Sequence, residues 1–192
     1  YSHVPGLIVM APSSAADAKG LLKSAIRNDN PVVFLENEIL YGRSGEVPTD
    51  PDWTVPIGKA DVKREGTDIT VIAIAWMVQE ALAAAQTLDK EGISVEVVDP
   101  RTLVPMDIET IRASVRKTGR LLVADEAGPT AGASAEIISL ATEDPETFKT
   151  LRAPVSRVCA LDAPIPYSPV LEDYVFPNRD RIADGIRAAM SA

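Results

Sequence analysis

The chain contains one histidine and one cysteine, His3 and Cys159, and this bounds the chemistry that its side chains can perform. A Ser-His-Asp triad or a histidine-based metal centre would have to use His3. A single cysteine excludes an intramolecular disulfide framework and every zinc motif built on paired cysteines. By pattern alone, a lone histidine before Val4-Pro5-Gly6 is typical of an exposed turn, and Cys159, in an apolar run, is typical of an inert core residue.

A carboxylate pair and a glycine-containing loop follow one apolar run. Asp125 and Glu126 end that run, which is where α/β folds place ligand sites. Acid/base chemistry or a metal would suit such a pair, but we favour hydrogen bonds that cap the next helix or join a subunit interface. The loop Gly128–Gly132 lacks both G-x-G-x-x-G and the Lys-Ser/Thr of a phosphate-binding loop, so we interpret it as a closely packed turn into a helix.

Composition excludes several classes of partner. With 46% apolar and 24% charged residues in 192, the chain has the composition of a globular protein with a real core. Its longest apolar run, around Val71 to Val78, is far shorter than the roughly 20 residues of a membrane-spanning helix, so no membrane is expected. The formal charge of −9 argues against nucleic acid, because neutralising phosphates requires surplus Lys and Arg; it suits a basic protein partner.

The first forty residues predict a strand, a helix and a second strand. Leu7–Met10 and Val32–Leu35 are apolar runs of strand length, and Ser14 followed by Asp17 three residues later is a capping-box-like helix start. So short a strand-helix-strand unit favours parallel pairing with a right-handed crossover. The predicted helix carries one apolar stripe, formed by Ala18, Leu21, Leu22, Ala25 and Ile26.

The remainder predicts an α/β three-layer sandwich with a mostly parallel sheet. Residues 41–66, interrupted by Pro and Gly, are interpreted as a linker with one short edge strand. From Thr67 strands and helices alternate, which specifies helices on both faces of a sheet. The predicted strands are 69–75, 95–98, 121–124 and 155–160; the predicted helices contain Val78–Leu88, Asp107–Lys117, Ile137–Leu140 and Asn178–Met190.

The first residues, Tyr1-Ser2-His3, include no initiator Met and follow no signal-peptide or transit-peptide pattern. We therefore expect residue 1 to be an internal point of a longer protein.

Several strings, taken together and in order, resemble the β subunit of the E1 component of 2-oxo acid dehydrogenase complexes. The resemblance covers essentially the whole chain. It rests on His3-Val4-Pro5-Gly6-Leu7, Asp17-Ala18-Lys19-Gly20-Leu21-Leu22, Asn30-Pro31-Val32-Val33-Phe34-Leu35-Glu36, Pro56-Ile57-Gly58-Lys59-Ala60, Arg101-Thr102-Leu103, Pro105-Met106-Asp107 and Pro164-Ile165-Pro166-Tyr167.

The resemblance implies a fold and a cofactor. Residues 1–40 would be the C-terminal part of a thiamine pyrimidine-binding domain, 41–66 a linker, and 67–192 a complete transketolase C-terminal-like domain. The family uses thiamine diphosphate with Mg²⁺, which would be bound mainly by the absent part of the first domain and by a separate α subunit. His3 would be the active-site histidine of the family's His-x-Pro-Gly motif, suited to proton exchange near neutral pH.

The resemblance also implies a structural potassium ion. The loop after the first helix would hold it through main-chain carbonyls and a side-chain oxygen, with Ala25, Asn28 and Asn30 as candidate ligands. Relatives commonly have Asp at the position of Asn28, so one formal negative charge is lost here. A plain helix-capping loop is the alternative, and we weigh the two equally.

The function implied is that of a pyruvate-type E1 β subunit: oxidative decarboxylation, with acyl transfer to the lipoyl group of E2. Acetoin and branched-chain 2-oxo acid enzymes stay open as alternatives, as does a non-catalytic dimerisation and E2-docking module; a transketolase or deoxyxylulose-phosphate synthase fragment fits less well. The expected partners are an E1 α subunit, a second β subunit and the basic subunit-binding domain of E2, reached through Glu172-Asp173 although Arg152 replaces an acidic E2 contact. The resemblance implies a bacterial cytoplasm or a mitochondrial matrix, and an isolated 192-residue chain that is inactive.

Overall fold

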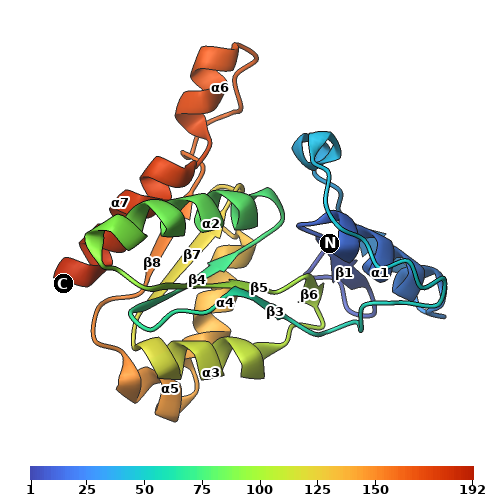
Figure 1. Cartoon of the computed structure of the whole chain (residues 1–192), viewed down its shortest axis with the longest axis horizontal. Coiled ribbons are helices and arrows are strands. Elements are labelled where there is room, and N and C mark those ends of the chain that lie inside the picture. Colours follow the sequence, from blue (N-terminus) through green and yellow to red (C-terminus); the bar gives the residue numbers. More distant parts are fainter.

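The computed structural model describes all residues, 1–192, and contains two β-sheets joined by the middle of the chain (Figure 1). The larger sheet has the strand order β3-β5-β4-β7-β8, and the smaller has the order β2-β1-β6. The larger consists of β3 (Asp61–Arg64), β4 (Ile69–Ala73), β5 (Val95–Asp99), β7 (Leu121–Asp125) and β8 (Ser156–Cys159). The smaller consists of β1 (Ile8–Met10), β2 (Val32–Phe34) and β6 (Thr102–Val104).

The larger sheet is parallel except at β3, which runs antiparallel to β5 along one edge. At its centre Val71 pairs with Val97 on one side and with Leu122 on the other. Every residue of β4, β5 and β7 is buried, as expected for strands covered on both faces, and most of these residues are apolar. The predicted mostly parallel sheet is confirmed.

Helices cover both faces of this sheet, which gives the three layers predicted from the alternation. One core joins the sheet to α2 (Trp76–Leu88) and α7 (Arg179–Ser191), and η2 (Asp89–Glu91) extends α2. The other core joins the opposite face to α3 (Ile108–Thr118) and α4 (Ala133–Thr142), with α5 (Pro145–Thr150) packed beside them. Ile182 and Ile186 of α7 are both fully buried against the sheet.

The helices predicted to contain residues 107–117 and 178–190 are present and begin at side-chain caps. Asp107 accepts a hydrogen bond from the Thr110 amide at 3.4 Å at the start of α3. Asn178 accepts one from the Arg181 amide at 3.0 Å at the start of α7. Gly119 ends α3 with φ of 71°, a left-handed conformation that glycine adopts without strain.

The N-terminal unit is a parallel β1-α1-β2 crossover with a small core. The helix α1 (Ala15–Ile26) begins as predicted, with the Asp17 amide donating to the Ser14 hydroxyl at 3.1 Å. Its apolar stripe is only partly packed: Leu21 is buried, whereas Leu22 and Ile26 are exposed. The second predicted strand, expected from its apolar residues to be buried, is instead half-buried, because β2 lies at the sheet edge. A three-stranded sheet covers one side of α1 and leaves the other side open.

The middle of the chain is more structured than the predicted linker. It begins with η1 (Glu38–Gly42), and β3 supplies the expected short edge strand. The strand β6 was not predicted; it pairs with β1, so residues after β5 return to the smaller sheet. The helix α6 (Pro169–Val175) was also not predicted. The domain boundaries at 40, 41–66 and 67 stay predictions. None of the helices has the length and apolarity needed to cross a bilayer.

Gly66 provides a test of how tightly β3 and β5 are joined. A Cβ at Gly66 would lie 2.2 Å from both the Glu96 nitrogen and the Val95 carbonyl carbon, so backbone would have to move. We expect Gly66→Ala to lower the free energy of unfolding by about 1–3 kcal/mol, measured by urea denaturation. Gly128→Ala is the control, since nothing lies within 4 Å of that position; we expect a change within about 0.5 kcal/mol. Equal stability of the two variants would contradict the close packing.

Candidate functional site

His3 is exposed and lies on the wall of a cavity of about 720 Å³, the candidate site. Three segments form this cavity: Tyr1–His3, Leu103–Ile108 from the end of β6 to the start of α3, and residues 131–140 at α4. Most lining residues are hydrophobic, among them Leu103, Met106 and Leu140. The candidate site therefore lies between the N-terminal unit and the helices of the larger sheet. No single local sequence motif could have predicted this position.

Local hydrogen bonds and strand pairing position His3. The Val4 amide donates to the Tyr1 carbonyl at 3.0 Å, which closes a turn around His3, and Gly6 follows with φ of 89°. A positive φ is the conformation that glycine accepts most readily, so the Pro-Gly sequence suits this turn. Pairing of Val9 with Val104 then brings the Leu103–Met106 wall beside the N-terminal segment.

Two ionisable groups besides the Tyr1 phenol line the cavity: the imidazole of His3 and the carboxylate of Glu136. No Lys or Arg lines it. Apolar walls with a few polar groups are typical of pockets for small organic ligands. An imidazole at such a wall can exchange a proton with a bound ligand.

Asp125 has the structural role favoured from the sequence. It is buried, and its carboxylate accepts from the Ala127 amide at 3.1 Å and from the Ser134 amide at 3.2 Å. These bonds fix the Gly128–Gly132 turn and satisfy the start of α4. Cys159 is buried beside this region with its sulfur 3.5 Å from the Ser134 hydroxyl, which confirms it as a core residue.

Glu126 makes a contact that sequence reasoning missed. Asn37 caps η1 through its carbonyl oxygen and donates through its amide nitrogen to Glu126 at 2.6 Å. Burial raises the pKa of Glu126 to about 7, the nearby Asp125 charge adds to the rise, and the Asn37 hydrogen bond opposes it. The string Glu36-Asn37-Glu38 contained the capping residue, but nothing local indicated a partner so distant in the chain.

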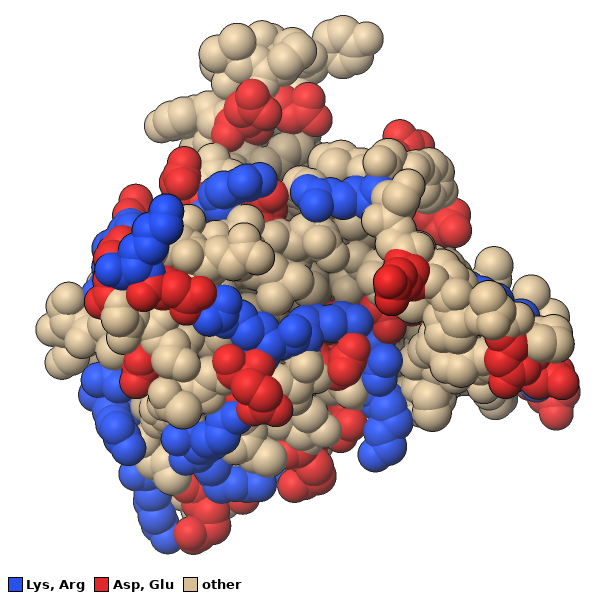
Figure 2. All heavy atoms as spheres, in the orientation of Figure 1, with Lys and Arg blue, Asp and Glu red and all other residues tan.

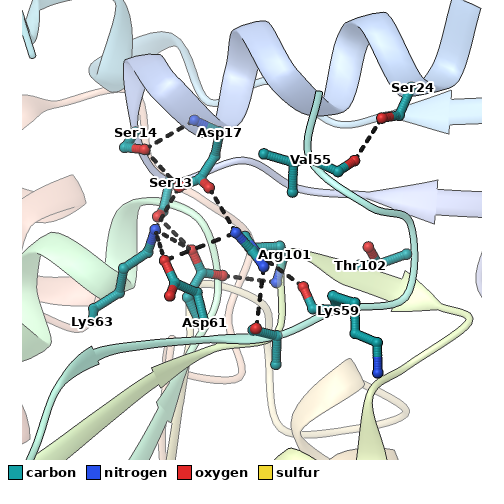
Figure 3. A network of polar contacts seen from close by, with 12 residues as sticks. Ser13, Ser14, Asp17, Ser24, Val55, Lys59, Asp61, Lys63, Arg101 and Thr102 are labelled. Atoms are coloured by element: carbon teal, nitrogen blue, oxygen red, sulfur yellow. Dashed lines mark hydrogen bonds and ion pairs between the residues drawn. The ribbon is translucent and has the colours of Figure 1, made fainter. Parts of the chain in front are cut away.

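A network of charged groups joins the N-terminal unit to the larger sheet (Figure 3). In Figure 3, Lys63 of β3 and Arg101, just after β5, point toward the carboxylate of Asp17 on α1. Lys63 Nζ lies 2.6 Å from Asp17 and 2.7 Å from Asp61, and Arg101 lies 3.4 Å from Asp17. We call the five residues Asp17, Asp61, Lys63, Asp99 and Arg101 the junction cluster.

Asp99 is the most deeply buried member of the junction cluster. Its side chain is fully buried, accepts from the Ser13 hydroxyl at 2.5 Å and from the Arg101 amide at 2.8 Å, and lies 3.8 Å from Lys63 Nζ. Burial raises the pKa of Asp99 to about 7, against the opposing effects of the Ser13 hydrogen bond and the Lys63 charge. At Asp17 burial also acts to raise the pKa, but hydrogen bonds from Lys63 and Ser14 outweigh it, so its pKa is lowered.

The predicted potassium loop is closed by its own hydrogen bonds. The Asn28 amide donates to the Ala25 carbonyl at 3.2 Å, and the Asn28 side-chain oxygen accepts from the Asn30 amide at 2.9 Å and from its side chain at 3.0 Å. The three residues do lie together. Their bonding matches the helix-capping alternative, and the potassium site stays a prediction. No group of three or more His, Cys, Asp or Glu side chains is arranged to hold a metal ion.

Two family models match the chain: "Transketolase, C-terminal domain" over residues 58–182 and "Transketolase, pyrimidine binding domain" over residues 1–43. The chain therefore belongs to the transketolase C-terminal domain family. A solved "Split gene transketolase, inactive beta4 tetramer" has the same fold, with a TM-score of 0.81 at 27% identity over 99% of this chain and 60% of that one.

The curated relatives are named enzyme subunits and so are more informative about function than the family models. The mitochondrial pyruvate dehydrogenase E1 component subunit beta-2 of Oryza sativa is 50% identical over 100% of this chain and 50% of its own length. The pyruvate dehydrogenase E1 component subunit beta of Rhizobium meliloti is 46% identical over 98% of this chain and 40% of its own length. An acetoin:2,6-dichlorophenolindophenol oxidoreductase subunit beta of Cupriavidus necator is 43% identical over 99% of this chain and 55% of its own length. The chain thus spans about half the length of these relatives.

The cavity beside His3 fits the aromatic rings of thiamine diphosphate better than it fits the diphosphate group. Its apolar wall and single imidazole suit an aromatic heterocycle, and the absence of lining Lys or Arg makes it unsuited to a diphosphate. The residues present therefore fit a position beside the rings of the cofactor.

The raised pKa of Asp99 predicts how stability depends on pH. Between the ordinary value of 3.8 and about 7, the folded state keeps the Asp99 proton that the unfolded state has lost, so this group makes stability fall as pH rises. Asp99→Asn removes the effect. We expect the stability of the variant relative to the unsubstituted protein to rise by about 1.4 kcal/mol per pH unit over this range, measured by urea melts.

Asp29→Asn, at an exposed position, is the control for the removal of a carboxylate as such. A stability difference for Asp99→Asn that does not depend on pH would contradict the assignment.

Proposed function

We propose that this chain is part of the β subunit of a thiamine diphosphate-dependent 2-oxo acid dehydrogenase E1, with pyruvate as substrate. The observation that carries the proposal is the similarity to pyruvate dehydrogenase E1 β subunits along the whole chain, with His3 at the wall of an apolar cavity. In this enzyme the product would be an acyl group transferred to lipoyl-E2.

The cofactor, when bound, would supply the electron sink for loss of CO₂ from the 2-oxo acid. The role of this chain is to exchange a proton and to exclude water. The His3 imidazole would donate a proton to, or accept one from, the oxygen of the former 2-oxo group. The wall formed by Leu103, Met106 and Leu140 would keep water from the reacting atoms.

The rest of the site would come from outside these 192 residues. The Mg²⁺-diphosphate part would be held by an α subunit, and two β subunits and two α subunits would form the complete enzyme. The chain by itself would then be inactive, in line with the name of the solved relative, a β-only tetramer described as inactive. The basic domain of E2 would dock at the acidic Glu172-Asp173 region. A mitochondrial matrix or a bacterial cytoplasm would be the compartment, as the relatives include both kinds.

A second candidate is an acetoin-cleaving enzyme of the same cofactor class, favoured by the 43% identity to the acetoin oxidoreductase β subunit. A branched-chain 2-oxo acid would be a third substrate. Turnover of the full-length protein, reconstituted with its α subunit, on pyruvate, acetoin and branched 2-oxo acids separates these possibilities; the preferred substrate has the highest kcat/KM.

His3→Ala in that reconstituted enzyme tests the proton-transfer role. We expect kcat to fall by about 10²–10⁴-fold, the usual contribution of a positioned acid-base group, while subunit assembly in gel filtration is unchanged. Ser2→Ala is the matched control, because Ser2 lines the same cavity without a titratable group, and it should retain turnover. Unchanged kcat in His3→Ala would refute the assignment.

The potassium prediction and the capping-loop alternative differ in one measurement. If Ala25, Asn28 and Asn30 hold K⁺, the Tm of the full-length protein should rise when choline chloride is replaced by KCl at equal ionic strength, and Asn28→Asp should enlarge the rise. Identical melting curves in the two salts would establish the capping loop.

A further inference from the structure

A short loop, Gly58–Ala60, lies against the Leu103–Met106 wall of the cavity beside His3, and we call it the backing loop. None of its three residues lines the cavity. A Cβ at Gly58 would lie 3.0 Å from the Pro105 Cγ, and Pro105 does line the cavity. Gly58 therefore packs on Pro105 from outside the cavity, and a side chain at position 58 would push this part of the wall inward.

Hydrogen bonds from both ends of the wall hold the backing loop in place. Arg101, which precedes the wall, donates to the Lys59 carbonyl at 2.9 Å (Figure 3) and to the Ala60 carbonyl at 3.1 Å. Asp107, which follows the wall, accepts from the Ala60 amide at 3.2 Å. The backing loop and the wall are therefore joined before and after the residues that face the cavity.

The contact at Gly58 leaves no room for a side chain. The Gly58 amide donates to the Thr102 hydroxyl at 3.2 Å, and Thr102 is fully buried. Gly58 has a φ of 73°, a left-handed conformation that glycine adopts without strain. Both this conformation and the nearness of Pro105 require glycine, so the backing loop fits closely against the wall.

The wall supported by the backing loop can distinguish ligands by size. Figure 2 shows Lys and Arg side chains lying among Asp and Glu side chains on the outer surface of the chain. No Lys or Arg lines the cavity, whereas Leu103, Met106 and Leu140 do. In an apolar pocket one methylene group changes kcat/KM by about 10–200-fold. The position of Pro105 therefore limits the size of the group that fits against the wall.

We propose that the backing loop determines which acyl group the cavity admits. It holds Pro105 at a fixed depth, so a 2-oxo acid with a small side chain fits and one with a larger side chain meets the wall. The inference rests on the proposed function, in which the reacting atoms lie beside His3. Gly58 acts through Pro105 and touches no ligand, so it is a positioning residue.

The test measures substrate preference in the full-length β subunit reconstituted with its α subunit. The measured ratio is kcat/KM for 2-oxobutanoate, which has one methylene more, divided by kcat/KM for pyruvate. We expect Gly58→Ala to lower this ratio about 3-fold or more, because the added methyl group moves Pro105 into the space that the methylene needs. Gly92→Ala is the matched control, since Gly92 has a φ of 76° but nothing lies within 4 Å of its added Cβ. Its ratio should equal that of the wild type.

Thr102→Val tests the inference in the opposite direction. It removes the hydroxyl that accepts from the Gly58 amide, so the backing loop supports Pro105 less firmly. We expect the ratio to rise about 3-fold, whereas Thr102→Ser, which keeps the hydroxyl, should leave it unchanged. A general loss of stability would lower kcat/KM for both substrates together, so opposite shifts of the ratio identify positioning. If Gly58→Ala does not fold in circular dichroism melts, Thr102→Val and its serine control decide the question.

Hydrogen exchange of the full-length β subunit measures the contact without turnover. We expect the amides of Leu103, Val104 and Met106 to exchange faster in Gly58→Ala and in Thr102→Val than in Gly92→Ala, because the first two variants disturb the wall and the third does not. Equal exchange in the three variants would show that the backing loop does not support the wall and would overturn the inference.

Turnover separates this inference from the proposed function. Wild-type enzyme that turns over neither 2-oxo acid would refute the proposed function and this inference with it. Active wild-type enzyme whose ratio is the same in Gly58→Ala and in Thr102→Val would overturn this inference alone.

Discussion

The relative position of the two sheets depends on contacts at their junction between the side chains of Asp17, Lys63, Asp99 and Arg101. Removing charges from water is unfavourable by several kcal/mol for each ion, so these groups are tolerable only when their partners are all in place. Lys63 comes from β3, Asp17 from α1 and Asp99 from the end of β5. Because α1, β3 and the end of β5 each supply a polar group that the others contact, their relative orientation is fixed by one cluster.

The junction cluster also determines where the candidate site can form. Arg101 donates to Asp17 and to the carbonyls of Lys59 and Ala60, and the chain turns there from β5 into β6. The strand β6 then pairs with β1, so the turn that carries His3 faces the Leu103–Met106 wall. We therefore expect a substitution in the junction cluster to shift the His3 imidazole relative to the Leu103–Met106 wall, although the cluster and His3 lie in different parts of the fold.

Local patterns predicted the elements, and long-range contacts explain what they missed. The strand Ile69–Ala73 and the helix that begins after Asp107 depend on patterns within a few residues, and both were predicted correctly. The run Thr102–Val104 is too short for its sequence to indicate a strand. It forms one because it pairs with the edge of β1. The partners Ser13–Asp99 and Asn37–Glu126 are each more than 80 residues apart, so the sequence showed an ordinary serine and an ordinary carboxylate. The histidine was recognised by resemblance, whereas its cavity required the fold.

The acidic character of the chain has two different physical origins, and only one of them informs about partners. Many carboxylates are consumed internally: Glu80 pairs with Arg179 at 3.0 Å, Asp125 caps α4, and the junction cluster holds Asp17 and Asp99. A net charge counts these equally with Glu172 and Asp173, which take part in no ion pair in this structure. Electrostatic attraction of a partner acts through charges that remain in water and uncompensated. The segment around α6, where Glu172 and Asp173 lie near the exposed Tyr167 and Tyr174, therefore carries more information about assembly than the total of −9.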